Sequence, residues 1–275
     1  MKIKVLGSGA SEGTPTIYCT CPVCTNARKV GGKEVRHRTS YMLDDDTLID
    51  FSPDMTALSG AGLDLTGIEH IFITHSHSDH FDLETMLTRS PFNAIGGPKK
   101  PLHIYGNEEV VRAVEDYLEH RPSVKLGVFT HLLEYEKTVQ VGKYSVTPLK
   151  STHVQGENCL AYLITDGGKY YLHLTDSSFP ENEVFEYIRI HKIKLALVAL
   201  DCTCGGSELE FYGHMNLKQN VRVKERLEQI GALDSGSIVI ATHIAHCSGF
   251  THEEFSIKAA QHGIGVAYDG LTLEI

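Results

Sequence analysis

Residues 71–80 join an apolar run to a dense group of metal-binding side chains. The run from Ile71 to Ile73 is typical of a buried strand, and the sequence THSHSDH follows it directly at residues 74–80. Imidazole and carboxylate are the usual protein ligands of catalytic zinc and of similar divalent ions. Three histidines and an aspartate lie too close together for a single ion, so the stretch predicts two adjacent ions. Such pairs with open coordination positions are typical of hydrolases.

Further candidate ligands are histidines and aspartates that follow other strand-like segments. His153 follows a segment ending at Leu149, Asp176 follows Tyr170 to Leu174, and His243 follows residues 238–240. A lone histidine in such a place is more often a hydrogen-bonded structural residue. The shared context of the three residues, and the need of the first cluster for partners, favour a metal site.

The seven cysteines divide into a tight cluster and a dispersed set. Cys19, Cys21 and Cys24 form a CxCxxC pattern, and an odd total argues against complete disulfide pairing. In a cytosolic chain such a cluster is more often a metal site than a disulfide framework. Structural zinc takes four ligands. We expect His246 to supply the fourth, with Cys247 as the alternative, and we assign no role to Cys202 and Cys204.

Composition limits the classes of function. The 275 residues are 41% hydrophobic and 22% charged, as in a soluble globular protein. No apolar run approaches the length of a membrane span, and the strand-like N-terminus does not resemble a signal peptide, so we expect a cytoplasmic protein. The formal net charge of −10 argues against a broad nucleic-acid footprint, although Arg28, Lys29, Lys33, Arg36 and Arg38 could form a local basic rim.

The order of the elements predicts an α/β fold. Expected helices start near Asn107, Glu181, His214 and Thr251, the last with capping-box spacing. The expected strands are Ile3–Leu6, Thr47–Asp50, His70–Thr74, Leu102–Tyr105, Tyr144–Leu149, Leu160–Thr165, Tyr170–Leu174, Leu195–Leu200, Ser237–Thr242 and Gly265–Tyr268. We expect a four-layer αβ/βα sandwich forming one domain over residues 1–275, with pseudo-halves at about 1–148 and 149–275.

The H-x-H-x-D-H pattern and the later His and Asp positions resemble the metallo-β-lactamase superfamily in chain order. The resemblance implies two mixed sheets packed face to face with helices outside. It implies a first ion held by His75, His77 and His153, a second held by Asp79, His80 and His243, and Asp176 bridging the two. The di-iron oxygen-reducing branch is expected to carry a glutamate where this chain has His77, so the pattern favours hydrolysis.

Additional motifs are similar to those of the PhnP-type phosphodiesterases, which act with the carbon–phosphorus lyase pathway. They are the Gly7-Ser8-Gly9 start, the Thr14-Pro15 step, the cysteine cluster and the run at residues 242–246. This resemblance implies a structural zinc held by Cys19, Cys21, Cys24 and His246. It also implies a catalytic role for His214, in the stretch Gly213 to Asn216. We expect Asp79 to orient the nucleophile in addition to ligating.

The expected activity is cleavage of a small or cyclic phosphodiester by metal-activated hydroxide, with two Zn or Mn ions in the active site and one structural Zn. We expect no membrane or nucleic-acid partner. A homodimer is common among such enzymes, although no feature of the sequence requires one.

Alternatives remain open. A tRNA 3′-end endoribonuclease carries the same motif but needs a basic arm, and the insertion candidate Pro91 to Pro101 has only Lys99 and Lys100. The same centre would serve for a non-phosphate ester, a thioester or a lactam. A non-catalytic PqqB-like protein shares the cysteine cluster.

Overall fold

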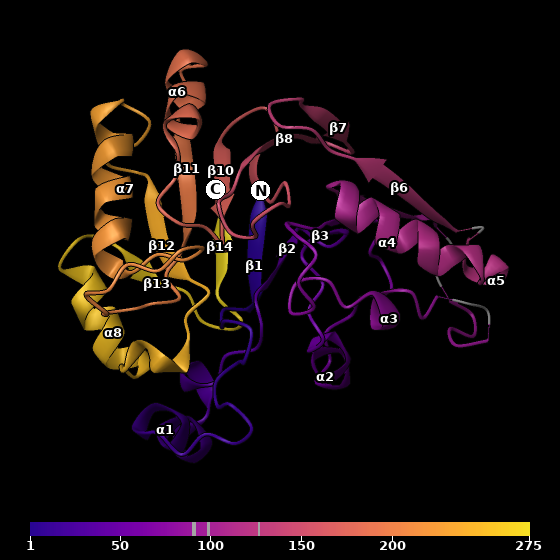
Figure 1. Cartoon of the computed structure of the whole chain (residues 1–275), viewed down its shortest axis with the longest axis horizontal. Coiled ribbons are helices and arrows are strands. Elements are labelled where there is room, and N and C mark those ends of the chain that lie inside the picture. Colours follow the sequence, from indigo (N-terminus) through magenta and orange to yellow (C-terminus); the bar gives the residue numbers. More distant parts are fainter. Residues whose placement is uncertain (90–91, 98–99, 126) are drawn as a thin grey trace.

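Two mixed sheets of seven strands each form the inner layers of the computed structural model, which describes residues 1–89, 92–97, 100–125 and 127–275. Helices cover the outer faces (Figure 1). The two chain ends lie together in the middle of the molecule, where the first and last strands pair. Of the insertion candidate at 91–101, Pro91, Pro98 and Lys99 lie outside the described residues.

The first sheet has the order β14-β1-β2-β3-β4-β5-β6, and β3 to β6 run parallel. Its strands are β1 (Lys2–Gly7), β2 (Ser40–Leu43), β3 (Thr47–Ile49), β4 (His70–Phe72), β5 (Leu102–Gly106), β6 (Val128–Leu132) and β14 (Thr272–Glu274). The helices of this part of the chain are α1 (Pro22–Val30), η1 (Gly32–Glu34), α2 (Met55–Gly60), α3 (Leu83–Met86), α4 (Glu108–Glu119) and α5 (Pro122–Lys125).

The second sheet has the order β13-β12-β11-β10-β9-β8-β7, and β10 to β13 run parallel. Its strands are β7 (Val139–Val141), β8 (Tyr144–Lys150), β9 (Leu160–Thr165), β10 (Tyr170–Leu174), β11 (Leu195–Asp201), β12 (Ile238–Thr242) and β13 (Gly265–Val266). The helices of this part are α6 (Asn182–Ile190), α7 (Leu217–Gln229), η2 (His246–Ser248) and α8 (His252–Ala260).

Three hydrophobic clusters hold the layers together. One lies between the sheets and includes Phe72 and Tyr162. A second packs Ile71 and Ile104 against α4 through Val110, and a third lies between the second sheet and α6 to α8. The alternation of Ile71 and Phe72 between two clusters shows that β4 is buried on both faces. The predicted four-layer α/β sandwich is confirmed.

All ten predicted strands are present, with ends shifted by up to two residues. Four further strands, β2, β6, β7 and β14, were not predicted. These are short strands of three to five residues, so they carry little periodicity. The chain passes from the first sheet to the second before residue 148, where the division was predicted. β7 and the greater part of β8 precede that residue and belong to the second sheet.

Capping side chains determine where the helices begin. Asn107 accepts a hydrogen bond from the backbone N of Val110 at the start of α4, and Thr251 forms the predicted capping box of α8. The helix predicted near His214 begins at Leu217 instead, because Asn216 and Gln219 form its capping box. His214 therefore lies in the preceding loop. No helix of the described part of the chain has the length and apolar character needed to span a membrane.

Candidate metal centre

The predicted ligands meet at one edge of the sandwich, where several strands end. The loop after β4 carries residues 75–80, and His153, Asp176 and His243 directly follow the region of β8, β10 and β12. Since β8 and β10 both lie antiparallel to β9, their carboxyl ends point to the same edge as that of β12. The topology thus brings together side chains that are far apart in the sequence.

The first group contains His75, His77 and His153, each with one ring nitrogen within 4.8 Å of the others. His153 Nδ1 donates to the carbonyl of Gly213 at 3.0 Å, which leaves its Nε2 facing His77 Nδ1 at 3.1 Å. The buried Nε2 of His75 has no hydrogen-bond partner among the described residues. Burial lowers the pKa of His75 well below its usual value, so the ring is neutral, as a ligand must be.

The second group contains Asp79, His80, Asp176 and His243, again with donor atoms within 4.8 Å of one another. The Nε2 atoms of His80 and His243 lie 3.3 Å apart. Asp176 Oδ2 contacts His80 Nε2 and lies 3.2 Å from His243 Nε2, yet it has no well-formed hydrogen bond among the described residues. Buried donor atoms without partners, gathered in one place, fit a bound cation.

The aspartates and histidines of the second group shift one another's pKa values. Burial would lower the pKa of His80, but Asp176, Asp50 and Asp79 raise it well above its usual value. The pKa of His243 is raised, chiefly by Asp176 against burial. Burial would raise the pKa of Asp176, but His243 and His80 lower it well below its usual value. These shifts favour ionised carboxylates and show that the carboxylates stabilise positive charge at this place. Such a donor set suits a divalent ion such as zinc.

Asp50, which the sequence analysis missed as a site residue, orients His80. Its buried carboxylate accepts from His80 Nδ1 at 2.7 Å and from the backbone N of Thr74 at 2.8 Å. Carboxylates in this position fix the tautomer and direction of a ligating histidine. A signal was available, because Asp50 follows β3 as directly as the predicted ligands follow their own strands.

Asp201 and Thr203 were missed as well. Asp201 Oδ2 accepts from His214 Nδ1 at 3.1 Å and from Thr203 Oγ1 at 2.8 Å. Thr203 Oγ1 lies 2.7 Å from His243 Nδ1. Burial opposes a charge on His214, but the hydrogen bond to Asp201 raises its pKa to about 9. His214 Nδ1 also lies 3.4 Å from Asp176 Oδ1, so the predicted catalytic histidine adjoins the second group.

The neighbouring cysteines Cys202 and Cys204 belong to none of these donor groups within the described ranges. Cys202 is fully buried, which fits the small packed side chain expected after a strand, and Cys204 is half-buried.

The backbone is unusual around both groups. Asp50, Asp176 and His243 have φ values of 61°, 45° and 54°, in the left-handed region. Gly213 has a φ of 89°, and a Cβ there would lie 2.9 Å from His153 Nδ1. Only glycine allows this loop to approach His153 so closely.

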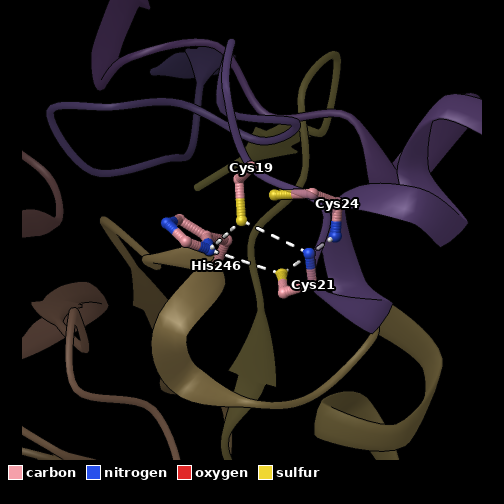
Figure 2. Close-up of side chains that lie close together, drawn as sticks. All are labelled: Cys19, Cys21, Cys24 and His246. Carbon is pink, nitrogen blue, oxygen red and sulfur yellow. Dashed lines mark hydrogen bonds between the residues drawn. The ribbon is translucent and has the colours of Figure 1, made fainter.

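The cysteine cluster forms a separate group at the start of α1 (Figure 2). Cys19 Sγ and Cys21 Sγ lie 3.6 Å and 3.5 Å from His246 Nδ1, and Cys24 completes the group. The structure thus brings His246 of η2 to the cluster, whereas Cys247 is exposed and outside it. Burial would raise the pKa of Cys21, but the Cys24 backbone N and His246 lower it to about 6, which favours the thiolate.

The Gly7-Ser8-Gly9 segment packs closely against neighbouring backbone beside the metal centre. A Cβ on Gly7 would lie 1.9 Å from the carbonyl oxygen of Arg38. The Ser8 carbonyl accepts from the backbone N of Ile244 at 3.0 Å, beside His243. The segment therefore supports the strand end that carries His243.

The basic rim is largely engaged within the protein. Arg36 is buried and donates to Ser8 Oγ and to the Ala267 carbonyl. Arg28 donates to the carbonyls of Thr16 and Cys19, and Arg38 pairs with Asp54. These three guanidinium groups are therefore engaged within the protein and do not form a free basic surface for an anionic polymer such as RNA.

Comparison with solved structures supports the same fold. A diphosphatase of the PhnP family superposes with a TM-score of 0.75 and 27% identity over 100% of this chain and 97% of its own. Zn²⁺-bound PqqB from Methylobacterium extorquens superposes with a TM-score of 0.76 over 100% of both chains, at 18% identity. The second likeness concerns the fold alone.

Among curated proteins, an octanoyltransferase of Porphyromonas gingivalis is 29% identical over 167 residues, 56% of this chain and 31% of its own length. A ribonuclease Z of Thermococcus onnurineus is 32% identical over 121 residues, 42% of this chain and 36% of its own length. The chain thus spans about a third of the curated relatives it matches. A model of the beta-lactamase superfamily domain matches residues 46–244, which include both donor groups, and the chain belongs to that superfamily.

Proposed function

We propose that this chain is a binuclear metal-dependent phosphodiesterase acting on a small or cyclic phosphate diester. One observation carries the proposal: the three-histidine group and the mostly buried second group lie side by side, with the His75 and His80 rings 4.5 Å apart. Asp176 of the second group lies beside His214, a histidine held by a carboxylate. The likeness to a diphosphatase of the PhnP family over the whole chain supports cleavage of phosphate esters.

The first ion of the pair is assigned to His75, His77 and His153. The second is assigned to Asp79, His80 and His243, with Asp176 between the two. Paired Zn²⁺ or Mn²⁺ ions, when bound, lower the pKa of a shared water and offset charge on the phosphate oxygens. His75 Nε2 and Asp176 Oδ2, without hydrogen-bond partners among the described residues, gain their missing partners in this way.

The protein's own residues would orient the reactants and transfer the proton. Asp79 is positioned to orient the attacking water in addition to ligating. His214, kept protonated by Asp201, would donate its proton to the leaving oxygen of the ester. General acid assistance of this kind is typically worth ~10²–10⁴ in rate.

We assign the cysteine cluster to a structural zinc held by Cys19, Cys21, Cys24 and His246. The donor set of three thiolates and one imidazole fits the closed tetrahedral site of structural zinc. The exposed position of Cys247 outside the group favours His246 as the fourth ligand.

The competing function is tRNA 3′-end processing, which the match to a ribonuclease Z favours. The net charge of −10 opposes it, since RNA binding needs clustered cations. Lys100, in the insertion candidate for a basic arm, pairs with Glu69. We therefore favour a small substrate in a soluble, cytoplasmic setting, with a homodimer as the proposed assembly.

An activity panel tests the proposal. The Zn²⁺- or Mn²⁺-loaded protein would be assayed on bis-p-nitrophenyl phosphate, a 2′,3′-cyclic nucleotide, a precursor tRNA, a thioester and a lactam. Turnover of the two small phosphodiesters is the expected result. Cleavage of the precursor tRNA with no small-substrate turnover would favour the endoribonuclease, and cleavage of the thioester or lactam alone would exclude phosphodiester chemistry.

A further inference from the structure

Ser76 lies between two proposed ligands of the first ion, His75 and His77, and a single carboxylate holds it. The backbone N of Ser76 donates to Glu157 Oε1 at 2.8 Å, and its Oγ donates to Glu157 Oε2 at 2.7 Å. Both hydrogen-bond donors of Ser76 therefore bind one carboxylate, which comes from the other half of the chain.

The carboxylate of Glu157 is itself fixed by a third donor. Asn107 Nδ2 donates to Glu157 Oε1 at 2.8 Å and to the carbonyl of Asn158 at 3.2 Å. Asn107 cannot easily turn away, because its Oδ1 caps α4 by accepting from the backbone N of Val110. Glu157 thus joins the end of β5, the loop after β4 and its own loop.

The loop that carries Glu157 also begins at the third proposed ligand of the first ion. Residues 154–159 connect His153 to β9, and the loop is anchored at its far end. There the backbone N of Leu160 donates to the carbonyl of Thr74 at 2.8 Å, and the carbonyl of Cys159 accepts from the backbone N of Ser151 at 3.0 Å. One short loop is therefore linked to all three ligands. It is covalently continuous with His153, and its Glu157 holds Ser76 between His75 and His77.

We propose that Glu157 is a positioning residue that sets the separation of the two ligand arms of the first metal ion, an inference that rests on the proposed binuclear function. His75 and His77 form one arm and His153 forms the other. A metal site tolerates errors of only about 0.5 Å in its ligands. Loss of an outer-shell partner of this kind typically lowers metal affinity 10–100-fold.

The experiment compares metal binding by Glu157→Ala and Glu157→Gln with the parent protein. Protein carrying the structural zinc alone would be titrated with Zn²⁺ against a chromophoric chelator, and thermal unfolding would be followed in parallel. In Glu157→Ala the affinity for one ion of the pair is expected to fall ~10–100-fold, with the other ion unaffected. Glu157→Gln is expected to stay near the parent, because its amide oxygen accepts from Ser76 N and its amide nitrogen donates to Ser76 Oγ.

Glu254→Ala is the matched control. The Glu254 carboxylate also accepts from the backbone N and Oγ1 of a single residue, Thr251, at 2.9 Å each, but it caps α8 outside both donor groups. Its removal is expected to lower the melting temperature and leave Zn²⁺ affinity unchanged. Ser76→Ala, which removes one donor, is expected to fall between the parent and Glu157→Ala, and it keeps the test open if Glu157→Ala does not fold.

Parental affinity for both ions in Glu157→Ala, with only a lower melting temperature, would overturn the proposal and leave Glu157 as a structural residue. A loss of affinity equal in Glu157→Ala and Glu157→Gln would also overturn it, since geometry would then not be the cause. These readouts use no ester substrate. If the loaded parent fails to cleave phosphodiesters, the proposed substrate class is wrong, whereas the metal titration still decides the role of Glu157.

Discussion

Asp50→Asn tests whether the carboxylate behind His80 determines which ring nitrogen is available to the second ion. Asp50 is fully buried and accepts from His80 Nδ1 at 2.7 Å, from Thr74 N at 2.8 Å and from Thr74 Oγ1 at 3.0 Å. Asparagine has one accepting oxygen and one donating nitrogen, so it cannot serve both sides. Its orientation then determines whether His80 Nε2 is free to ligate.

In the metal-free variant the amide nitrogen can donate to His80 Nδ1, which moves the ring proton to Nε2, where Asp176 accepts it. All groups are satisfied, so the melting temperature of the metal-free protein should change little. Metal binding requires the reverse orientation, in which the amide nitrogen faces the buried N–H of Thr74. An unsatisfied buried donor costs about 1–3 kcal/mol. That corresponds to a loss of roughly 5- to 150-fold in affinity for the second ion.

The assay is a competition titration of the metal-free active site with Zn²⁺, together with thermal unfolding of the same sample. Asp44→Asn is the control, since Asp44 accepts from the backbone N of Lys2 at 3.1 Å and pairs with Lys143 at 2.7 Å but belongs to neither donor group. It should lower the melting temperature without changing Zn²⁺ affinity. Two ions bound by Asp50→Asn with parental affinity would refute the reasoning about His80.

Three further outcomes are expected. His75→Ala should abolish turnover while leaving the circular dichroism spectrum and the melting temperature of the metal-free protein near the parent values, because the fold does not depend on the catalytic ions. Cys21→Ser should release one tightly held zinc, measured by mass spectrometry, and should lower the melting temperature, since structural zinc contributes folding free energy directly. If both quantities stay at the parent values, there is no structural zinc. His214→Gln should lower kcat by ~10²–10⁴ with two active-site ions still bound, and an unchanged kcat would exclude a general acid role.

The donor residues could be predicted from the sequence because their signal is local. His153, Asp176 and His243 each follow an apolar strand. Strands that run in the same direction end at the same edge of a sheet, so these residues come together there. The same rule applies to Asp50 and Asp201, which were read only as strand ends or passed over. Their partners lie elsewhere in the chain: Asp50 is 30 residues from His80, and Asp201 is 13 residues from His214. A rule that looks for ligands does not identify residues that act through a ligand.

The missed strands and the late start of α7 have different causes. β14 pairs with β1 through Lys2 and Glu274, at opposite ends of the chain. Such a pairing leaves no trace in a short window of sequence, and three residues of strand carry too little alternation to stand out. The late start of α7 follows from a side-chain hydrogen bond of Gln219 to the backbone N of Asn216, which competes with helix formation upstream.

At three positions of the metal centre the backbone conformation favours glycine, whereas the chemistry needs a side chain. Asp50, Asp176 and His243 have positive φ at the ends of strands, where glycine would avoid the conformational cost. A strained residue of this kind costs of order 1–3 kcal/mol. Glycine would remove that cost, but it would also remove the carboxylate that orients His80 and two donors of the second ion. The need for donor atoms therefore determines the residue type at these positions, although the backbone conformation would favour glycine.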